Sequence, residues 1–236
     1  MNPQIRLRTP EQLDNLSLNG NTLKKTLNSL KLINIFLGNH RQLSKAVLSY
    51  CKSNHDRREF RIVDLGCGGG DTLRYISKRL KYHNIKATFI GIDGNPSSII
   101  YAKERTIDTR NINFITANII DKDFKTPDCD ILISSHFIYH FEDSELTDFL
   151  KKIHSQKIEY VIFSELYRNK TAYNLFKLVS FVLPISDIAK KDGMLAIQRA
   201  FSIKELTNII QNSTIEKYKI SKKPFFRTIT EIDPSA

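Results

Sequence analysis

Hydrophobic and polar positions divide the chain into three parts that differ in periodicity. In the first part, residues 1–58, apolar side chains such as Leu23 and Leu27 recur every three or four positions. This spacing predicts an amphipathic helix that Gly38 ends, followed by a second helix over about 43–51. Because no strand-like run interrupts this part, we expect it to be helical.

The second part, from Phe60 to Glu165, alternates short apolar runs with helical stretches. Runs such as Phe89–Ile92 and Tyr160–Phe163 are almost entirely apolar, which is typical of strands in a parallel sheet covered on both faces. Strands that alternate with helices through short links predict an open α/β sheet with right-handed crossovers.

After Glu165 the alternation stops. Helices are predicted over Ala172–Leu183 and Ile203–Gln211, the second with a capping box at its start. The tail predicts two final strands, 214–221 and 225–232, which we expect to form a hairpin at the edge of the sheet.

The composition is that of a globular protein: of the 236 residues, 41% are hydrophobic and 26% are charged. The apolar runs fall short of the roughly 20 residues of a membrane-spanning helix. The first residues lack the apolar core of a signal peptide. Three scattered cysteines are too few for a disulfide framework or a four-cysteine zinc site. We therefore expect a soluble, cytoplasmic protein without a membrane span.

Positive charge is concentrated at the two ends of the chain. The net charge is +7 over residues 1–62, −2 over 63–165 and +6 over 166–236, which accounts for the total of +11. Basic ends suit an anionic partner such as nucleic acid, a phosphorylated substrate, an acidic carrier protein or a membrane surface. A generally basic proteome explains the same numbers equally well, so charge alone identifies no partner.

A glycine-rich turn follows the first predicted strand. Residues 61–71 read RIVDLGCGGGD, in which an apolar strand runs into Asp64 and four glycines before a helix begins. Glycine permits positive φ and close approach of a ligand, and the helix N-terminus offers free amides. The dinucleotide pattern G-x-G-x-x-G fails because Asp71 holds its third glycine position, and no Gly-Lys-Ser/Thr follows as in a P-loop. Counted from Asp64, the segment fits D-x-G-x-G-x-G.

This pattern resembles the first motif of class I S-adenosylmethionine-dependent methyltransferases. The resemblance covers about Phe60–Glu165 and implies an α/β fold with a Rossmann-like, doubly wound, seven-stranded sheet. The sheet would be mostly parallel, with an antiparallel C-terminal edge and a helical cap. S-adenosyl-L-methionine is the implied cofactor: Asp93 would accept hydrogen bonds from its ribose, and Asn118 and the Ile119 amide would contact its adenine. The implied cofactor-binding residues are Asp64, Gly66, Cys67, Gly68, Asp93, Gly94, Asn118, Ile119 and Ser135.

Three later segments, 164–168, 191–193 and 199–202, resemble bacterial small-molecule methyltransferases associated with polyketide, aromatic polyene or phenolic-lipid biosynthesis. This second resemblance implies O-methylation of a small-molecule acceptor, a phenolic or polyketide-derived secondary metabolite that is free or bound to a carrier protein. We expect four segments: a helical cap (1–58), the cofactor-binding core (59–165), a helical lid (166–200) and a last helix with strands that complete the sheet (201–236).

A phenolic acceptor with a pKa near about 10 needs a base to remove its proton. The candidates are His140, which matches the histidine after the fourth strand in the family, and Asp192 and His136. His140 equally fits a role in packing or in orienting the substrate, Asp192 fits a solvated turn slightly better, and His136 fits a structural role better. His136 and His140 have the spacing of a metal-binding pair, but no H-E-x-x-H pattern contains them, so we expect no metal. Candidate substrate contacts are Tyr139, Tyr167, Arg168 and Arg199, although surface ion pairing is the more frequent role of an arginine.

Two further features have two interpretations each. Cys67, inside the glycine-rich turn, fits a small filler better than a nucleophile. The apolar side chains of Tyr173, Phe176, Phe181 and Leu183 have the spacing of a core face, or they line a tunnel for an apolar substrate.

Other functions remain open at this point. An RNA or tRNA methyltransferase would explain the basic ends, but aromatic residues are not interleaved with the basic runs and no RNA-binding appendage is recognisable, so we expect no nucleic-acid partner. A non-catalytic subunit that binds the cofactor and docks an acidic carrier protein is a second alternative. A dehydrogenase is disfavoured by Asp71 in the glycine pattern.

Overall fold

A computed structural model describes residues 1–57, 59–156 and 158–234. The strands are β1 (Phe60–Leu65), β2 (Ala87–Asp93), β3 (Ile112–Thr116), β4 (Ile131–Ser135), β5 (Tyr160–Leu166), β6 (Lys217–Lys223) and β7 (Arg227–Asp233). Within the described residues these seven strands form one sheet in the order β3-β2-β1-β4-β5-β7-β6. The first five strands pair in parallel, whereas β7 runs antiparallel to both β5 and β6. The predicted fold class, including the antiparallel C-terminal edge, is confirmed.

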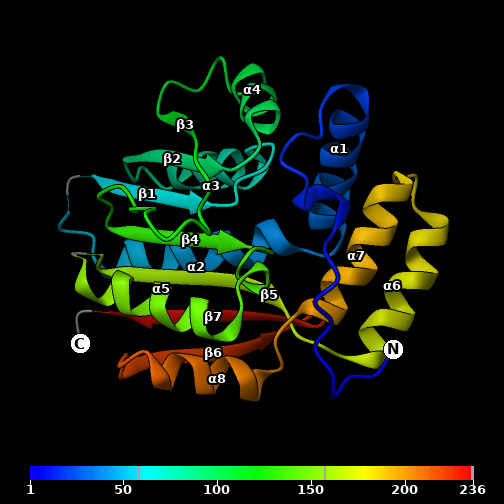
Figure 1. Ribbon diagram of the computed structural model, residues 1–236. Helices are drawn as coiled ribbons and strands as arrows, with labels where there is room; N and C mark the ends of the chain where they lie inside the picture. Colours follow the sequence, from blue (N-terminus) through cyan, green and yellow to red (C-terminus); the bar gives the residue numbers. More distant parts are fainter. Residues whose placement is uncertain (58, 157, 235–236) are drawn as a thin grey trace.

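Helices cover both faces of this sheet (Figure 1). The helices are α1 (Gly20–Phe36), α2 (Asn39–Ser53), α3 (Asp71–Tyr82), α4 (Pro96–Glu104), α5 (Asp143–Ser155), α6 (Lys170–Val182), α7 (Asp187–Arg199) and α8 (Ile203–Asn212), with short 3-10 helices η1 (Gln12–Asp14) and η2 (Ile138–His140). On one face, strand residues such as Ile62 pack against α2, α3 and α4. On the other, residues such as Leu132 pack against α5 and α8. Alternate strand residues therefore enter two separate cores, as expected for a doubly wound sheet.

Local sequence signals explain several helix boundaries. Gly38 separates α1 from α2 with a φ of 68°, a left-handed conformation that glycine adopts without a Cβ clash. At the start of α8, the side chain of Ser202 accepts a hydrogen bond from the Glu205 amide, and the Glu205 side chain accepts one from the Ser202 amide. This is the capping box that the sequence predicts.

The second helix lies elsewhere than predicted. We expected all of residues 1–58 to cap the strand ends, but α2 lies along the face of the sheet. Its buried side chains Leu43, Val47 and Cys51 share a core with β1 and α3. The apolar stripe of α2 packs against a sheet face that would otherwise be open, so only the residues before α2 contribute to a cap.

Two C-terminal elements also differ from the prediction. Residues around Asp192 form the helix α7 and not a turn, because the Ser186 side chain caps Ala189 and apolar residues on α7 pack against α6. The strands β6 and β7 begin two or three residues later than predicted. Their turn includes Phe225 and Phe226, which have positive φ values of 61° and 55°.

Residues 58, 235 and 236, which end two predicted segments, lie outside the described residues.

The helices α1, α6 and α7 lie beyond the arrowheads of the parallel strands (Figure 1). Residues 6–14, which we call the N-terminal strap, run across α7 toward the same strand ends. Open α/β sheets bind ligands at the carboxyl ends of their strands. This cap therefore covers the edge where the predicted site residues lie. Among the helices of the described residues, none is long and apolar enough to cross a membrane.

Candidate active site

A cavity of about 680 Å³ lies between the strand ends and the cap. Its wall includes side chains of β1, β2 and β4, the loops that follow them, and the cap helices α1, α6 and α7. All nine residues predicted to bind the cofactor line this cavity, although they come from four separate parts of the core. Their shared location follows from the topology, because the carboxyl ends of neighbouring parallel strands meet at one edge of the sheet.

The glycine-rich turn requires its glycines. Gly66 and Gly70 have φ values of 71° and 70°. A Cβ on Gly66 would lie 2.6 Å from Cδ2 of Phe137, and one on Gly70 would lie 2.7 Å from Cζ of Phe114. Larger residues would therefore meet both strained backbone and neighbouring rings. The turn brings backbone close to the cavity, as a bound nucleoside would require.

Two acidic side chains lie under this turn. Asp93 accepts hydrogen bonds from the amides of Gly68 and Asn95, both at 2.9 Å, so it also shapes the turn. Asp64 is 2% exposed, and its Oδ1 has no hydrogen-bond partner among the described residues. Burial, together with the neighbouring charge of Asp93, raises the pKa of Asp64 well above its usual value. A buried carboxyl oxygen without a partner at a cavity wall is suited to a ligand that carries a donor or a positive charge.

The other predicted cofactor contacts are also held in place locally. Asn118 Oδ1 is 3.3 Å from the Ile120 amide that donates to it, and Ser135 Oγ accepts from Asn39 Nδ2 at 2.6 Å. Burial raises the pKa of the Cys67 thiol well above its usual value, with a further contribution from Asp93. A thiol that stays protonated is a poor nucleophile, which favours the filler interpretation of Cys67.

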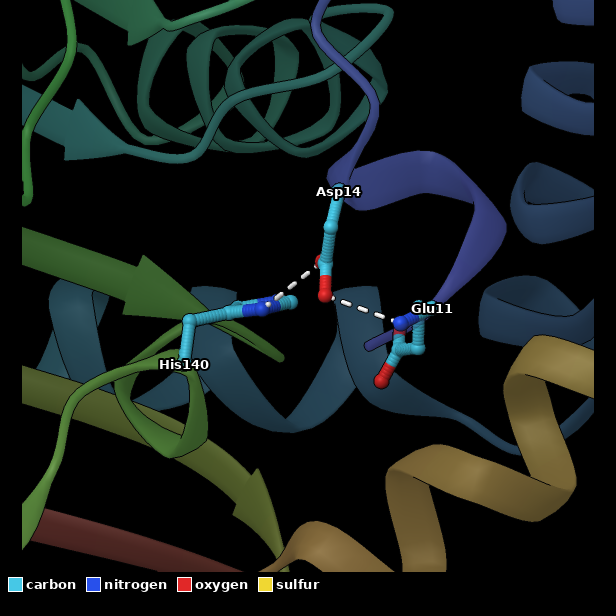
Figure 2. A group of neighbouring side chains, drawn as sticks. All are labelled: Glu11, Asp14 and His140. Carbon is cyan, nitrogen blue, oxygen red and sulfur yellow. Dashed lines mark hydrogen bonds and ion pairs between the residues drawn. The ribbon is translucent and has the colours of Figure 1, made fainter. Parts of the chain in front are cut away.

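His140 contacts an acidic residue of the N-terminal strap (Figure 2). Its Nδ1 lies 3.0 Å from Oδ1 of Asp14, and Oδ2 of Asp14 lies 2.7 Å from Nη1 of Arg199. Burial alone would raise the pKa of Asp14, but the hydrogen bond and charge of His140 lower it to about 2. Asp14 is therefore ionised at neutral pH. Nδ1 of His140 lies within hydrogen-bond distance both of Asp14 Oδ1 and of Arg199 Nη2, the latter at 3.2 Å, so the tautomer of the ring decides which contact is made. The other ring nitrogen, Nε2, makes no hydrogen bond among the described residues.

Glu11, Asp14 and His140 place one ligand atom each within 4.8 Å of one another, as metal ligands do. A cationic side chain already lies between the two carboxyl groups: Nη1 of Arg199 is 3.5 Å from Glu11 Oε1 and 2.7 Å from Asp14 Oδ2. Burial raises the pKa of Glu11 to about 8, so this carboxyl is mostly protonated at neutral pH. The cluster is thus organised around a guanidinium, and we assign no metal to it.

The central part of the chain, residues 62–156, matches a family model described as a methyltransferase domain. This part of the chain is therefore a methyltransferase domain with the class I fold. The prediction of an S-adenosylmethionine-dependent enzyme of this class is confirmed.

Solved structures of similar fold agree with this assignment. The plantazolicin methyltransferase BpumL in complex with SAH is 17% identical over 91% of each chain, with a TM-score of 0.67. The magnesium protoporphyrin IX methyltransferase ChlM from Synechocystis PCC 6803 is 15% identical over 82% of this chain and 83% of that one, with a TM-score of 0.55. The CurJ carbon methyltransferase is 13% identical over 84% of this chain but only 54% of that one, with a TM-score of 0.62. Identities this low show the fold alone.

Two candidate bases of the methyltransferase have other roles. Asp192 is 2% exposed, and its two oxygens accept hydrogen bonds from the amides of Gln12 and Leu13 at 3.0 and 3.1 Å. It therefore fixes the N-terminal strap, which corrects both the base and the solvated-turn interpretation. His136 accepts a hydrogen bond from Arg227 through Nε2, and burial lowers the pKa of this ring well below its usual value. Its Nε2 lone pair is thus unavailable to an acceptor.

Two predicted substrate contacts lie outside the cavity wall. Arg168 donates to the carbonyl oxygens of Pro3 and Ala200 at 2.8 and 2.7 Å and to Glu205 at 2.6 Å. Each nitrogen of its guanidinium thus makes one hydrogen bond, and together these bonds join the N-terminus to the start of α8. Tyr167 packs against Phe226, with ring centroids 6.1 Å apart. Arg168 and Tyr167 are therefore corrected to structural roles.

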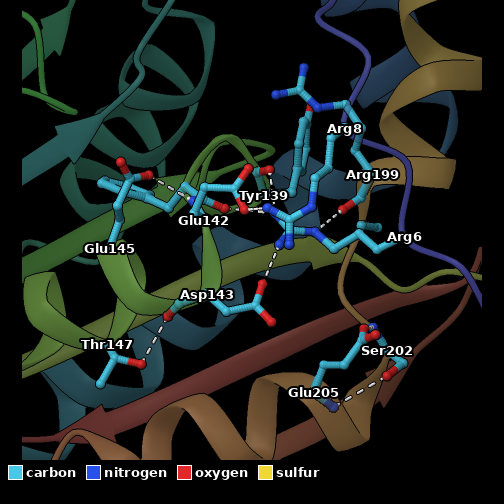
Figure 3. Close-up of polar contacts among 12 residues, drawn as sticks. Arg6, Arg8, Tyr139, Glu142, Asp143, Glu145, Thr147, Arg199, Ser202 and Glu205 are labelled. Carbon is cyan, nitrogen blue, oxygen red and sulfur yellow. Dashed lines mark hydrogen bonds and ion pairs between the residues drawn. The ribbon is translucent and has the colours of Figure 1, made fainter.

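Tyr139 and Arg199, in contrast, line the cavity of the methyltransferase. Arg6 fixes the loop that carries Tyr139 (Figure 3): Nη2 donates to the carbonyl oxygens of Tyr139 and Phe141 at 2.8 and 2.7 Å, and Nε donates to that of Arg199 at 2.9 Å. Arg6, Arg168 and Arg199 all make contacts inside the protein. Part of the positive charge that the sequence concentrates at the two chain ends therefore serves to hold the fold together.

The structure also adds residues that the sequence interpretation missed. Glu11 and Asp14 lie in the part predicted only as a helical cap, and they reach the cavity because the strap folds back over it. His40 and Arg227 line the cavity as well, from the start of α2 and the start of β7. A lone arginine in a strand pattern carries no signal of burial, so sequence spacing could not identify Arg227.

Proposed function

We propose that the methyltransferase transfers a methyl group from S-adenosylmethionine to an oxygen of a small-molecule acceptor, a phenolic or polyketide-derived compound. The observation that carries the proposal is one continuous cavity. Its wall includes both the glycine-rich turn and His140, which Asp14 contacts. A methyl donor bound at the turn and an acceptor bound beside the histidine would thus share one enclosed space.

The side chains near the turn suit the cofactor. The unpartnered Oδ1 of Asp64 and the carboxyl of Asp93 would offer acceptors and negative charge to a sulfonium nucleoside with two ribose hydroxyls. Asn118 and Ile119 would hold the adenine. When bound, S-adenosylmethionine supplies an electrophilic methyl group on a good leaving group. The protein contributes alignment and a place for the acceptor proton.

His140 is suited to take that proton. In the tautomer whose Nδ1–H donates to Asp14, the ring carries its lone pair on Nε2. In the proposed step the acceptor O–H bond breaks, its proton moves to Nε2, and the oxygen electron pair is released for attack on the methyl carbon. Asp14 then stabilises the imidazolium that forms, as a positioning residue. General base catalysis of this kind contributes roughly 10²–10⁴-fold.

The cap favours an acceptor with an apolar body. Leu30 and Ile33 of α1, Phe176 and Val179 of α6, and Ile197 of α7 line the cavity. Of the apolar set predicted on the lid, Phe176 faces the cavity, whereas Phe181 is 87% exposed. By their names, the similar structures act on magnesium protoporphyrin IX and plantazolicin, which supports a small-molecule acceptor.

The test begins with cofactor binding. Calorimetry with S-adenosylhomocysteine should give saturable binding to the purified protein. Labelled S-adenosylmethionine incubated with a panel of phenols and with a small-molecule extract of the host, followed by mass analysis, should then reveal a product methylated on oxygen. Binding without methylation of any compound would favour the non-catalytic alternative, and salt-dependent binding to RNA in a gel shift would favour the RNA alternative.

A variant separates the base from the binding site. His140→Gln should lower kcat by about 10²–10⁴-fold and leave the affinity for S-adenosylhomocysteine unchanged. His55→Gln, at an exposed histidine outside the cavity wall, is the matched control and should retain full activity. An unchanged kcat for His140→Gln would refute the base role, without affecting the assignment of the cofactor site.

A further inference from the structure

Arg227 is a fully buried cationic side chain in the wall of this cavity. It begins β7, has an exposed fraction of 0%, and contacts the cavity. Nη1 donates to Nε2 of His136, but Nε has no hydrogen-bond partner, and the described residues offer no carboxylate within ion-pair distance. Burial lowers the pKa of Arg227 to about 10, so the side chain remains a cation at neutral pH. A buried charge without a counter-ion is strongly unfavourable, which indicates that a ligand supplies one.

Two histidines offer further donors beside it. His40 is 3% exposed and lines the cavity, and both of its ring nitrogens lack partners within the described part of the chain. Burial and the charge of Arg227 lower the pKa of His40 to about 4, so its neutral ring presents one N–H group. His136 accepts from Arg227 at Nε2, so its proton resides on Nδ1. A guanidinium and two imidazole N–H groups therefore occur together in one part of the wall.

The nearest acidic side chain does not neutralise this cluster. Oε1 of Glu165 accepts from the amides of Phe137 and Ile138 at 3.0 and 3.2 Å, and Glu165 lies outside the cavity wall. Burial raises the pKa of Glu165 to about 7, although the positive charge of Arg227 opposes the shift. A group that is partly protonated at neutral pH is an incomplete counter-ion for Arg227.

The cluster lies far from the acidic residues assigned to the cofactor. In the strand order β1-β4-β5-β7, three strand spacings separate Arg227 from Asp64, or roughly 14 Å measured across the sheet. Apolar side chains line the cavity near it, including Leu37 and Phe226. The cavity thus combines an acidic end under the glycine-rich turn with a cationic end surrounded by apolar side chains.

We propose that Arg227, with His40 and His136, binds a carboxylate of the methyl acceptor, so that the acceptor is an apolar or aromatic carboxylic acid. The inference refines the acceptor class of the proposed function. It gives Arg227 the role in binding an acidic substrate group that the sequence had suggested for Arg168 and Arg199. A guanidinium with neighbouring N–H donors is a typical site for a carboxylate. The carboxylate of S-adenosylmethionine itself has the same chemistry, so the experiment must distinguish the two sources.

Binding measurements with a matched pair of probes test the proposal. The probes are para-hydroxybenzoate, para-hydroxybenzamide and the next longer members of each series, titrated by calorimetry into the protein with and without S-adenosylhomocysteine. We expect each acid to bind at least about tenfold more tightly than its amide. Arg227→Met should abolish this preference, and Arg227→Lys should retain part of it. Arg41→Met, at an exposed position of α2, removes the same charge and should leave the preference intact.

Two other outcomes would overturn the inference. Equal affinity of the wild-type protein for acid and amide would show that no carboxylate is recognised. A loss of affinity for S-adenosylhomocysteine in Arg227→Met, with unchanged affinity for methylthioadenosine, would assign Arg227 to the cofactor carboxylate. Failure of the wild-type protein to bind S-adenosylhomocysteine would refute the proposed function, whereas the comparison of acid with amide in the cofactor-free protein would still decide the inference. Circular dichroism of Arg227→Met establishes that the variant is folded.

Discussion

Replacing Glu165 by Gln tests how the loop that carries His136 and His140 is held. Oε1 of Glu165 accepts hydrogen bonds from the amides of Phe137 and Ile138, and its Oε2 is buried without a partner. A glutamine has nearly the same shape, and its carbonyl oxygen can accept the same two bonds. The substitution therefore removes the titration of this site while keeping its geometry.

The size of the effect follows from the pKa. Burial raises the pKa of Glu165 from 4.5 to about 7, and each pKa unit corresponds to about 1.4 kcal/mol. The unfolded chain ionises Glu165 at lower pH than the folded protein does. Its contribution to stability is thus fully present below pH 4.5 and is lost as the pH rises through 7. The total loss is about 3 kcal/mol, of which about 2 kcal/mol falls between about pH 5 and pH 8.

Urea unfolding of both proteins at about pH 5 and pH 8 measures this loss. Other groups with shifted pKa values, such as Glu11 and His40, titrate in both proteins, so the difference between the two curves isolates Glu165. We expect the free energy of unfolding of Glu165→Gln, relative to wild type, to rise by about 2 kcal/mol from the lower to the higher pH. Parallel pH dependences of the two proteins would refute the reasoning.

Two further substitutions test the turn and the strap. Gly66→Ala should lower stability by about 1–3 kcal/mol and weaken binding of S-adenosylhomocysteine, because its φ is 71° and a Cβ would lie 2.6 Å from Cδ2 of Phe137. Gly20→Ala has a similar φ of 61° but no atom within 4 Å, so in thermal unfolding it should show a smaller loss; equal losses would contradict the steric argument. Arg6→Ala should increase hydrogen exchange of amides in residues 7–14, since Arg6 joins the strap to three carbonyl oxygens, and unchanged protection would refute this anchoring role.

The order of elements and the glycine-rich turn could be predicted because they depend on contiguous residues. Apolar strands alternate with helices, and the pattern from Asp64 to Gly70 lies within a single turn. Once parallel strands are assumed, their carboxyl ends must meet, so Asp93 and Asn118 could be placed near the same turn without knowing any distance. Prediction was less accurate for helices, because a helical pattern does not show which surface the helix packs against. The second helix, α2, was expected in the cap but covers a face of the sheet, and Asp192 lies within the helix α7 and not in a turn.

The chain's own sequence therefore determined the fold class, the methyltransferase motif and the residues that surround the turn, since local patterns encode each of them. Only the tertiary structure decided which other side chains line the cavity together with the turn. Asp14 meets His140, and Arg227 meets His136, through the packing of segments that are distant in sequence. Neither pairing has a characteristic spacing, because its geometry depends on how the cap and the last strands pack. For the same reason, three arginines with the same chemistry have different environments. Arg168 donates to three partners within the fold, Arg199 joins two carboxyl groups, and Arg227 has no carboxylate within ion-pair distance in the described part of the chain.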